Sequence, residues 1–242
     1  MLTITDSQAS VNFGVYQSAY PLLVRETVNG VTREALRADM PTRGNGNSVP
    51  LFVAGPPYVP TPPSTVVTVA DYKFTSGSLT SSDTHEQSLA GSISSGGGSG
   101  YSISATALTG RLRATTTNNN PNSADAKVAN GQHTKFTVSG VAGRRLYPKS
   151  MQLGIRREGS SPDRLTVYAT TNGSTFEVLM DNVAVPSTSA FQNILNNNLA
   201  SFPALQNAAS ITLVIVFHGG STGLTNGRND IDNVLVTSAV TD

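Results

Sequence analysis

Histidine is the residue that acid–base catalysis at neutral pH would need first, and the chain has three, His85, His133 and His218, each isolated in the sequence. None belongs to an H-E-x-x-H zinc pair, and no serine lies in a G-x-S-x-G turn. There is no cysteine to act as a nucleophile or thiolate ligand. The sequence therefore predicts a protein that is not an enzyme, and a His–Asp–Ser group assembled in space is the open alternative.

A cluster of acidic and amide side chains near the C-terminus has the chemistry of a calcium site. Residues 229–233 read Asn-Asp-Ile-Asp-Asn and offer hard oxygen ligands. Asp71, on the first strand expected in this part of the chain, would join them if the first and last strands are neighbours. Asp71, Asp230 and Asp232 are the candidate ligands of a structural calcium ion. The alternative is turn and strand-end carboxylates that bind no ion.

Aromatic side chains are the usual platforms for sugar rings, and they are few here. There is no tryptophan, and aromatic residues make up 6% of the chain. Tyr101, Tyr147 and Tyr168, together with Phe217, are the candidates for lining a glycan site. The alternative is that aromatics at alternating strand positions pack in the core.

The overall charge argues against polyanionic partners. Sixteen basic and fifteen acidic residues give a formal net charge of +1, so we expect no nucleic-acid partner. No stretch approaches the ~18 apolar residues that a membrane span needs. Residues 1–10 have neither the basic nor the apolar region of a signal peptide. We therefore expect a soluble chain that begins as mature protein or has lost its signal.

The elements that would position these residues are mostly strands. Charged residues make up only 13% of the chain, and the abundant Ser, Thr and Asn favour strands and turns over helix interiors. Alternating patterns predict nine strands, at Thr65–Phe74, Tyr101–Ala107, Gly110–Thr116, Thr134–Val138, Ser150–Arg157, Arg164–Thr170, Thr175–Met180, Ser210–Phe217 and Asp230–Thr237. One helix is predicted at Ser189–Ala200, and Ser94–Gly100 and Thr115–Asn122 are predicted surface loops. The fold class expected is all-β, a jelly-roll β-sandwich.

The first quarter of the chain has a different composition. Eight of the thirteen prolines lie in residues 1–63, and those at 55–63 predict a polyproline linker. Before it, Asn29-Gly30 predicts a β-hairpin over residues 22–36. We expect two parts, an extended N-terminal arm at 1–63 and the sandwich at 64–242.

The arm carries apolar residues that it cannot cover by itself. The hairpin has an apolar row that includes Val28 and Val31, and Leu51, Phe52 and Val53 follow with no evident local strand partner. We expect these five residues to bind a partner, either other copies of the chain or a host lattice.

Short motifs add a resemblance. Residues from about 70 to 240 resemble the jelly-roll, carbohydrate-binding-module-like domains of bacterial secreted and surface proteins. The motifs are Asp71-Tyr72-Lys73-Phe74, residues 165–176 and Ile231-Asp232-Asn233-Val234. The middle motif departs from the pattern, with Thr171-Asn172-Gly173 where Ser/Asp-Gly is usual. The resemblance implies the jelly-roll fold and, less directly, sugar binding.

The overall layout, a proline-rich arm before a cysteine-free jelly roll, is similar to capsid decoration and cement proteins of tailed bacteriophages. That resemblance implies a virion structural protein on the capsid surface, a homotrimer that attaches through its arm to a capsid or other virion protein. The alternative is a secreted or cell-surface carbohydrate-binding module. Apart from the calcium ion, no cofactor is expected.

Overall fold

The computed structural model describes residues 22–28, 31–41, 48–57, 65–83, 85–106, 110–117, 123–141, 143–220 and 226–241. The chain divides into two compact units, Met1–Thr61 and Pro62–Asp242. The sequence placed this boundary two residues later, between residues 63 and 64.

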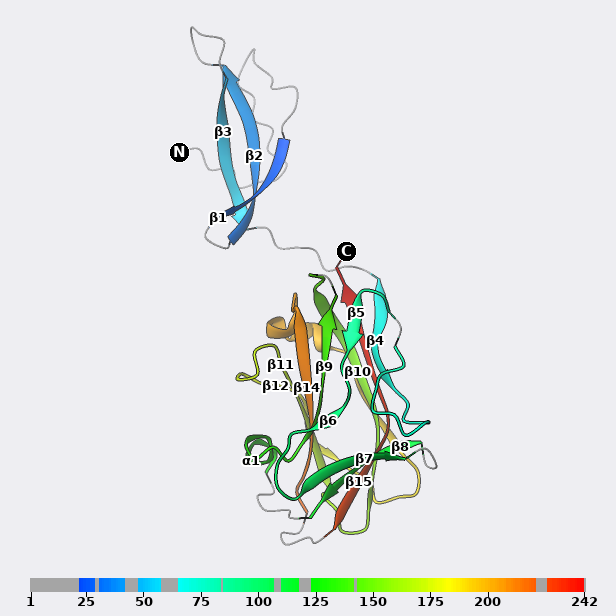
Figure 1. The fold of residues 1–242 in the computed structure, drawn as a ribbon. Coiled ribbons are helices and arrows are strands. Elements are labelled where there is room, and N and C mark those ends of the chain that lie inside the picture. The colour runs from blue at the N-terminus through cyan, green and yellow to red at the C-terminus, as the bar shows by residue number, and fades with distance from the viewer. Residues whose placement is uncertain are drawn as a thin grey trace. The chain divides into compact units, whose positions relative to one another are not determined.

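The first unit contains a three-stranded antiparallel sheet in the order β1-β2-β3 (Figure 1). Its strands are β1 (Leu22–Val28), β2 (Val31–Pro41) and β3 (Ser48–Pro57). Val28 lies opposite Val31, the pairing that the Asn-Gly turn predicts. Leu51 lies opposite Ala38 on β2. The expectation that Leu51, Phe52 and Val53 lack a local strand partner is therefore wrong.

The second unit is a sandwich of two six-stranded antiparallel sheets, so the predicted fold class is confirmed. In the first, which we call the β15 sheet, the strands are β4 (Val66–Tyr72), β7 (Tyr101–Thr106), β8 (Arg111–Thr116), β10 (Leu146–Glu158), β13 (Gln192–Asn196) and β15 (Gly227–Val240). In the second, the β14 sheet, they are β5 (Ser88–Ala90), β6 (Ser94–Ser95), β9 (Thr134–Gly140), β11 (Arg164–Thr170), β12 (Glu177–Ala184) and β14 (Ser210–His218). All nine predicted strands are present.

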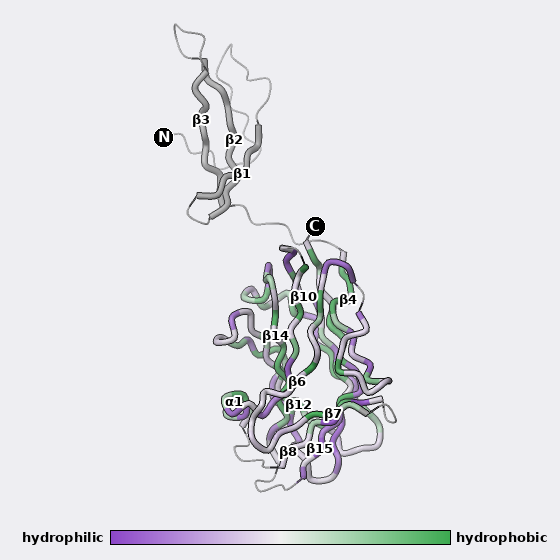
Figure 2. Tube along the Cα trace, viewed as in Figure 1, coloured by the Kyte–Doolittle hydropathy of each residue, from purple (hydrophilic) through white to green (hydrophobic). Residues whose placement is uncertain are grey.

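The core lies between the two sheets and follows from the alternation of the strands. On β8, Leu112 is fully buried, whereas its neighbours Arg111 and Arg113 lie on the opposite face. Tyr72 of β4 meets Phe136 of β9 edge to face, with 5.0 Å between the ring centroids. Figure 2 shows hydrophobic residues, in green, along the strands of the sandwich. The sandwich therefore has its own core.

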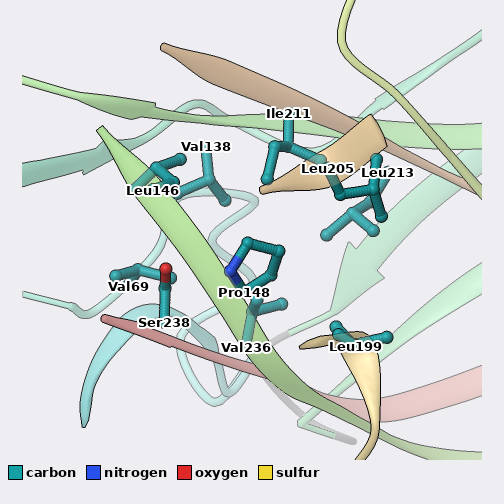
Figure 3. Close-up of a pocket in the computed structure, with 10 residues that line it drawn as sticks. All are labelled: Val69, Val138, Leu146, Pro148, Leu199, Leu205, Ile211, Leu213, Val236 and Ser238. Atoms are coloured by element: carbon teal, nitrogen blue, oxygen red, sulfur yellow. The ribbon is translucent and has the colours of Figure 1, made fainter. Parts of the chain in front are cut away.

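One small void remains in this core. Its volume is about 10 Å³, close to the space of a single water molecule. Figure 3 shows the side chains around it: Val69, Val138, Leu146, Pro148, Leu199, Leu205, Ile211, Leu213, Val236 and Ser238. The Ser238 hydroxyl already accepts the Tyr147 N–H and donates to the Ala239 carbonyl. The void is a packing gap and is too small to hold a ligand.

The helix predicted at Ser189–Ala200 is wrong. The segment forms β13, followed by a 3₁₀ turn at Leu199–Ser201, and a second turn lies at Pro203–Leu205. Ile194 lies opposite Leu153 of β10 and packs against the core, while Leu195 is 59% exposed. Asparagine, which is frequent in this segment, is a weak helix former. Strand pairing with the edge of β10 is therefore favoured over a helix.

The sandwich also has elements that were not predicted, among them β5, β6 and α1. The helix α1 (Ala124–Ala129) follows directly after the predicted loop at Thr115–Asn122. Within the predicted loop Ser94–Gly100, β6 pairs with β9. Gly98 lies against the turn after α1, where an added Cβ would come within 2.1 Å of the Asn130 carbonyl oxygen. This close approach requires glycine at position 98, and the Gly96 and Gly98 N–H groups donate to the His133 and Gly131 carbonyls, which holds the segment in place.

Candidate functional site

A groove of about 420 Å³ lies between α1 and strands β11, β12 and β14, and we call it the α1 groove. α1 packs beside β14 on the face of the sheet turned away from the core (Figure 1). The lining residues are mainly polar: Ser123, Ala124, Asp125, Thr166, Tyr168, Val178, Asp181, Asn182 and His218. Its volume is within the range typical of small-ligand sites.

Strand alternation and register bring the floor of the groove together. Leu165 and Val167 of β11 belong to the core, so Thr166 and Tyr168 point to the opposite face. Thr166 lies opposite Val216 of β14, two positions from His218 on the same face. Thr166 and His218, which are 52 residues apart in sequence, therefore converge through sheet pairing alone.

A bulge in β12 supplies the rim. Leu165 lies opposite Val183, but Val167 lies opposite Met180, so Asp181 and Asn182 together face Thr166. Asn182 has a positive φ of 49°, and asparagine tolerates this left-handed conformation better than most residues. The bulge places two exposed polar side chains at the groove.

The hydrogen bonds in the groove centre on one hydroxyl. Thr166 Oγ1 lies 2.9 Å from Nε2 of His218 and 3.4 Å from a carboxylate oxygen of Asp181. It also accepts the N–H of Asn182 at 3.1 Å. Thr166 is 1% exposed, so its hydroxyl orients its neighbours and is not open to attack a substrate. In this group of residues the His–Asp–Ser type of catalytic arrangement lacks an accessible nucleophile.

Tyr168 ties α1 to the sheet. Its hydroxyl donates a hydrogen bond to the Asp125 carboxylate, and its ring meets Phe176 edge to face at 6.1 Å. Burial and this carboxylate raise the pKa of Tyr168 well above its usual value. The phenol is therefore neutral at any physiological pH.

The basic groups near the groove have lowered pKa values. The pKa of His218 is lowered by burial first and by the charge of Lys127 second. Burial lowers the pKa of Lys127 from 10.5 to about 8. His218 is consequently neutral at pH 7 and can both donate and accept a hydrogen bond.

The tyrosines expected to line a glycan site do not expose their rings to solvent. Tyr101 is 7% exposed and shares a hydrogen bond with Thr134 at 2.8 Å inside the sandwich. Tyr147 is buried and donates to Asn207 at 3.1 Å. Phe217 lies in the core, and only Tyr168 lines the groove. The buried rings pack as the core alternative describes, so these tyrosines do not form an aromatic platform.

The three carboxylates expected to bind calcium are separated. Asp230 is completely buried and its carboxylate pairs with Arg111, Arg113 and Arg156 at 3.0–3.1 Å. Asp71 lies opposite Leu235, five positions from Asp230 along β15, which is about 16 Å at the rise of a strand. Asp71 pairs instead with Lys73 at 3.0 Å.

Asp232 lies near Gly154 on the same sheet as Asp230. Among the described residues no group of three His, Asp or Glu side chains is arranged to hold a metal ion. The structure thus does not bring Asp71, Asp230 and Asp232 together.

Calcium binding itself stays a prediction, and the geometry favours a negative result at these residues. We expect millimolar calcium to leave the melting temperature of the full chain unchanged, because guanidinium groups occupy Asp230. The measurement is thermal unfolding with calcium or EDTA, on wild type and Asp232→Ala. A rise in melting temperature with calcium that Asp232→Ala abolishes would contradict this expectation.

The predicted partner-binding residues Val28, Val31, Leu51, Phe52 and Val53 all lie in the strands of the first unit. Their side chains fall outside what the structure describes. Backbone register places Leu51 and Val53 on one face of β3 and Phe52 on the other.

The chain matches no protein-family model and no curated protein. Solved structures that resemble it include a family 29 carbohydrate-binding module from Piromyces equi, at 8% identity over 72% of this chain and 91% of that one, with a TM-score of 0.37. The xylan-binding module CBM15 is 13% identical over 72% and 97%, with a TM-score of 0.40. SCLam, a non-specific endo-β-1,3(4)-glucanase of family GH16, is 12% identical over 73% and 92%, with a TM-score of 0.35.

At these identities and TM-scores the likeness carries no argument about function, which has to be argued from the site. The similarity to phage decoration proteins stays a prediction. No helix in the described part of the chain is long and apolar enough to cross a membrane.

Proposed function

We propose that this protein is a non-catalytic binding protein whose sandwich holds a carbohydrate in the α1 groove. The observation that carries the proposal is the convergence of carboxylate, amide, imidazole and phenol groups on one groove. Asp125, Asp181 and Asn182 are exposed there, so their oxygens and amide are available to a ligand. A secreted or cell-surface location would suit such a module.

The chemistry of the groove suits a polyol. Sugar hydroxyls both donate and accept hydrogen bonds, and the planar side chains of Asp181 and Asn182 offer acceptors and donors side by side. Val178, which is 44% exposed, supplies apolar surface for the C–H face of a ring. The hydroxyl of Thr166 is already satisfied, which supports binding without bond cleavage.

The test is a glycan array followed by calorimetry with the best oligosaccharide. We expect Asp181→Ala to weaken binding about 10- to 100-fold, since a hydrogen bond to a charged group contributes about 1.5–3 kcal/mol. Glu177→Gln is the matched control, because it removes a carboxylate from the same strand outside the groove. Binding that Asp181→Ala leaves intact, or no binding to any glycan, would refute the proposal.

A second candidate function, assembly through the N-terminal unit, is favoured by the register of its sheet. Seven apolar residues share one face of β1–β3: Leu23, Leu36, Ala38, Met40, Val49, Leu51 and Val53. The same face also carries Arg25, Thr27, Thr32 and Glu34 toward the β1–β2 hairpin end, so the apolar residues form a patch that does not cover the whole face. A three-stranded sheet with such a patch needs a second layer to exclude water from it. We propose that other copies of the chain, as a homotrimer, or a virion protein provide that layer, as in a capsid decoration subunit.

Native mass measurements test the assembly. We expect the full chain to form an oligomer, and a chain beginning at Ser64 to be a folded monomer, because the sandwich has its own core. Phe52→Ala and Leu51→Ala probe the two faces, and truncating the anchor on the buried face should weaken assembly by two or more orders of magnitude. If the Ser64 chain assembles as well as the full chain, attachment lies on the sandwich.

A further inference from the structure

The wall of the α1 groove is attached to the sheet by few contacts. Ala124 and Val128 of α1 pack on a small cluster of Tyr168, Val214 and Val216 that is separate from the main core. The helix has only six residues, and one hydrogen bond, from Tyr168 to Asp125, ties its first turn to β11. A short helix with so little buried apolar surface is a region of low local stability.

The same helix buries a lysine without a partner. Lys127 is completely buried, and its Nζ has no hydrogen-bond partner. An ammonium group out of water with no counter-charge strongly disfavours the docked helix, whereas a neutral amine costs much less. The protonation state of the Lys127 amine therefore affects the free energy with which α1 docks on the sheet.

The charged groups around Lys127 do not compensate it. His218 approaches from β14, and the imidazole of His133, next to β9, lies at the backbone of Lys127. Lys135 of β9 adds positive charge at His133, and Arg164 of β11 adds positive charge at His218. Two carboxylates, Asp163 and Asp181, act on His218, while the third, Asp125, accepts the Tyr168 hydroxyl. No carboxylate in the described part of the chain bonds to Nζ.

We propose that protonation of Lys127 loosens the wall of the α1 groove: α1 is held firmly on the sheet when the buried amine is neutral, and it detaches more readily when the amine is charged. Release would remove Ser123, Ala124 and Asp125 from the groove. The consequence for a ligand rests on the proposed function, but the release itself does not.

The direction follows from the pKa of the amine. Lys127 has a pKa of about 8 when buried and 10.5 when exposed, so the docked helix binds fewer protons. Docking is accordingly strongest above pH 10.5 and weakens as the pH falls toward 8. The pKa values of His133 and His218 are lowered and that of Tyr168 is raised, so these shifts move all three groups away from the interval between pH 7 and 9.5.

Hydrogen exchange of the full chain tests the release. Protection factors of residues 124–129, corrected for the chemical exchange rate, should be about 30-fold higher at pH 9.5 than at pH 7 by this linkage. Lys127→Met should remove the difference and give high protection at both values. Lys127→Arg should give low protection at both, and peptides from the β14 core report whether each variant is folded.

Equal protection of α1 in the wild type at pH 7 and 9.5, with β14 protected, would overturn the proposal, as would a Lys127→Met variant that keeps the wild-type difference. A second arm measures binding of the best array glycan at both pH values. A pH-dependent helix with no glycan bound by any form would refute the proposed function and leave the loosening of the wall by protonation standing.

Discussion

Asp230→Asn is expected to lower the free energy of unfolding of the sandwich by about 3–5 kcal/mol, the cost typical of removing one partner from a buried ion pair. Asp230 is completely buried, and guanidinium groups from two strands, β8 and β10, converge on it. The substitution keeps the shape of the side chain and removes its charge. Arg111, Arg113 and Arg156 would then lie close together with only Glu158 to balance them.

Urea unfolding at pH 7 measures this effect, and Glu158→Gln is its control. Glu158 pairs with Arg111 and Arg113, and also with Arg228, but its side chain is 38% exposed, so we expect a loss of about 1 kcal/mol or less. Adding Arg113→Gln to Asp230→Asn removes one of the unbalanced charges and should restore part of the stability. A cost below 1 kcal/mol for Asp230→Asn would show that packing, not this ion network, holds β8, β10 and β15 together.

The strands of the sandwich could be predicted because their pattern is local. On β8 the apolar Leu112 and Ala114 alternate with Arg111 and Arg113, and this local alternation identifies both the strand and its buried face. The element at 189–200 was misassigned because Phe191, Ile194, Leu195 and Leu199 also fit a helical spacing. Pairing with the edge of β10, for example of Leu153 with Ile194, makes the segment a strand, and this partner is distant in sequence.

Most of the candidate site could not be predicted from the sequence. Thr166 and His218 meet through strand pairing, and Asp181 joins them through a bulge that no local pattern marks. Tyr168 was singled out as an aromatic platform, and its role in the groove comes from its hydroxyl. Asp230 was expected to bind calcium because its arginine partners lie on other strands and are not apparent from the local sequence. The sequence shows which residues carry functional groups, but the partners of those groups are set by tertiary contacts.

Lys127→Met is expected to raise the free energy of unfolding at pH 7 by about 3 kcal/mol. The methionine fills similar space without a charge, whereas the buried lysine has a pKa of about 8 against 10.5 in the unfolded chain. Each unit of that difference corresponds to about 1.4 kcal/mol. Because the folded pKa is the lower one, the destabilisation is complete below pH 8 and disappears above pH 10.5.

Urea unfolding at pH 7 and pH 10.5 therefore gives a signature that a simple gain in packing would not. The advantage of Lys127→Met over wild type should be largest at pH 7 and should shrink to about 1 kcal/mol or less at pH 10.5. Lys73→Met, at a side chain that is 62% exposed, should change stability by less than about 1 kcal/mol at either pH. If Lys127→Met destabilises the protein at pH 7, the ammonium group has a counter-charge in the folded state, and the lysine stabilises α1 instead of weakening it.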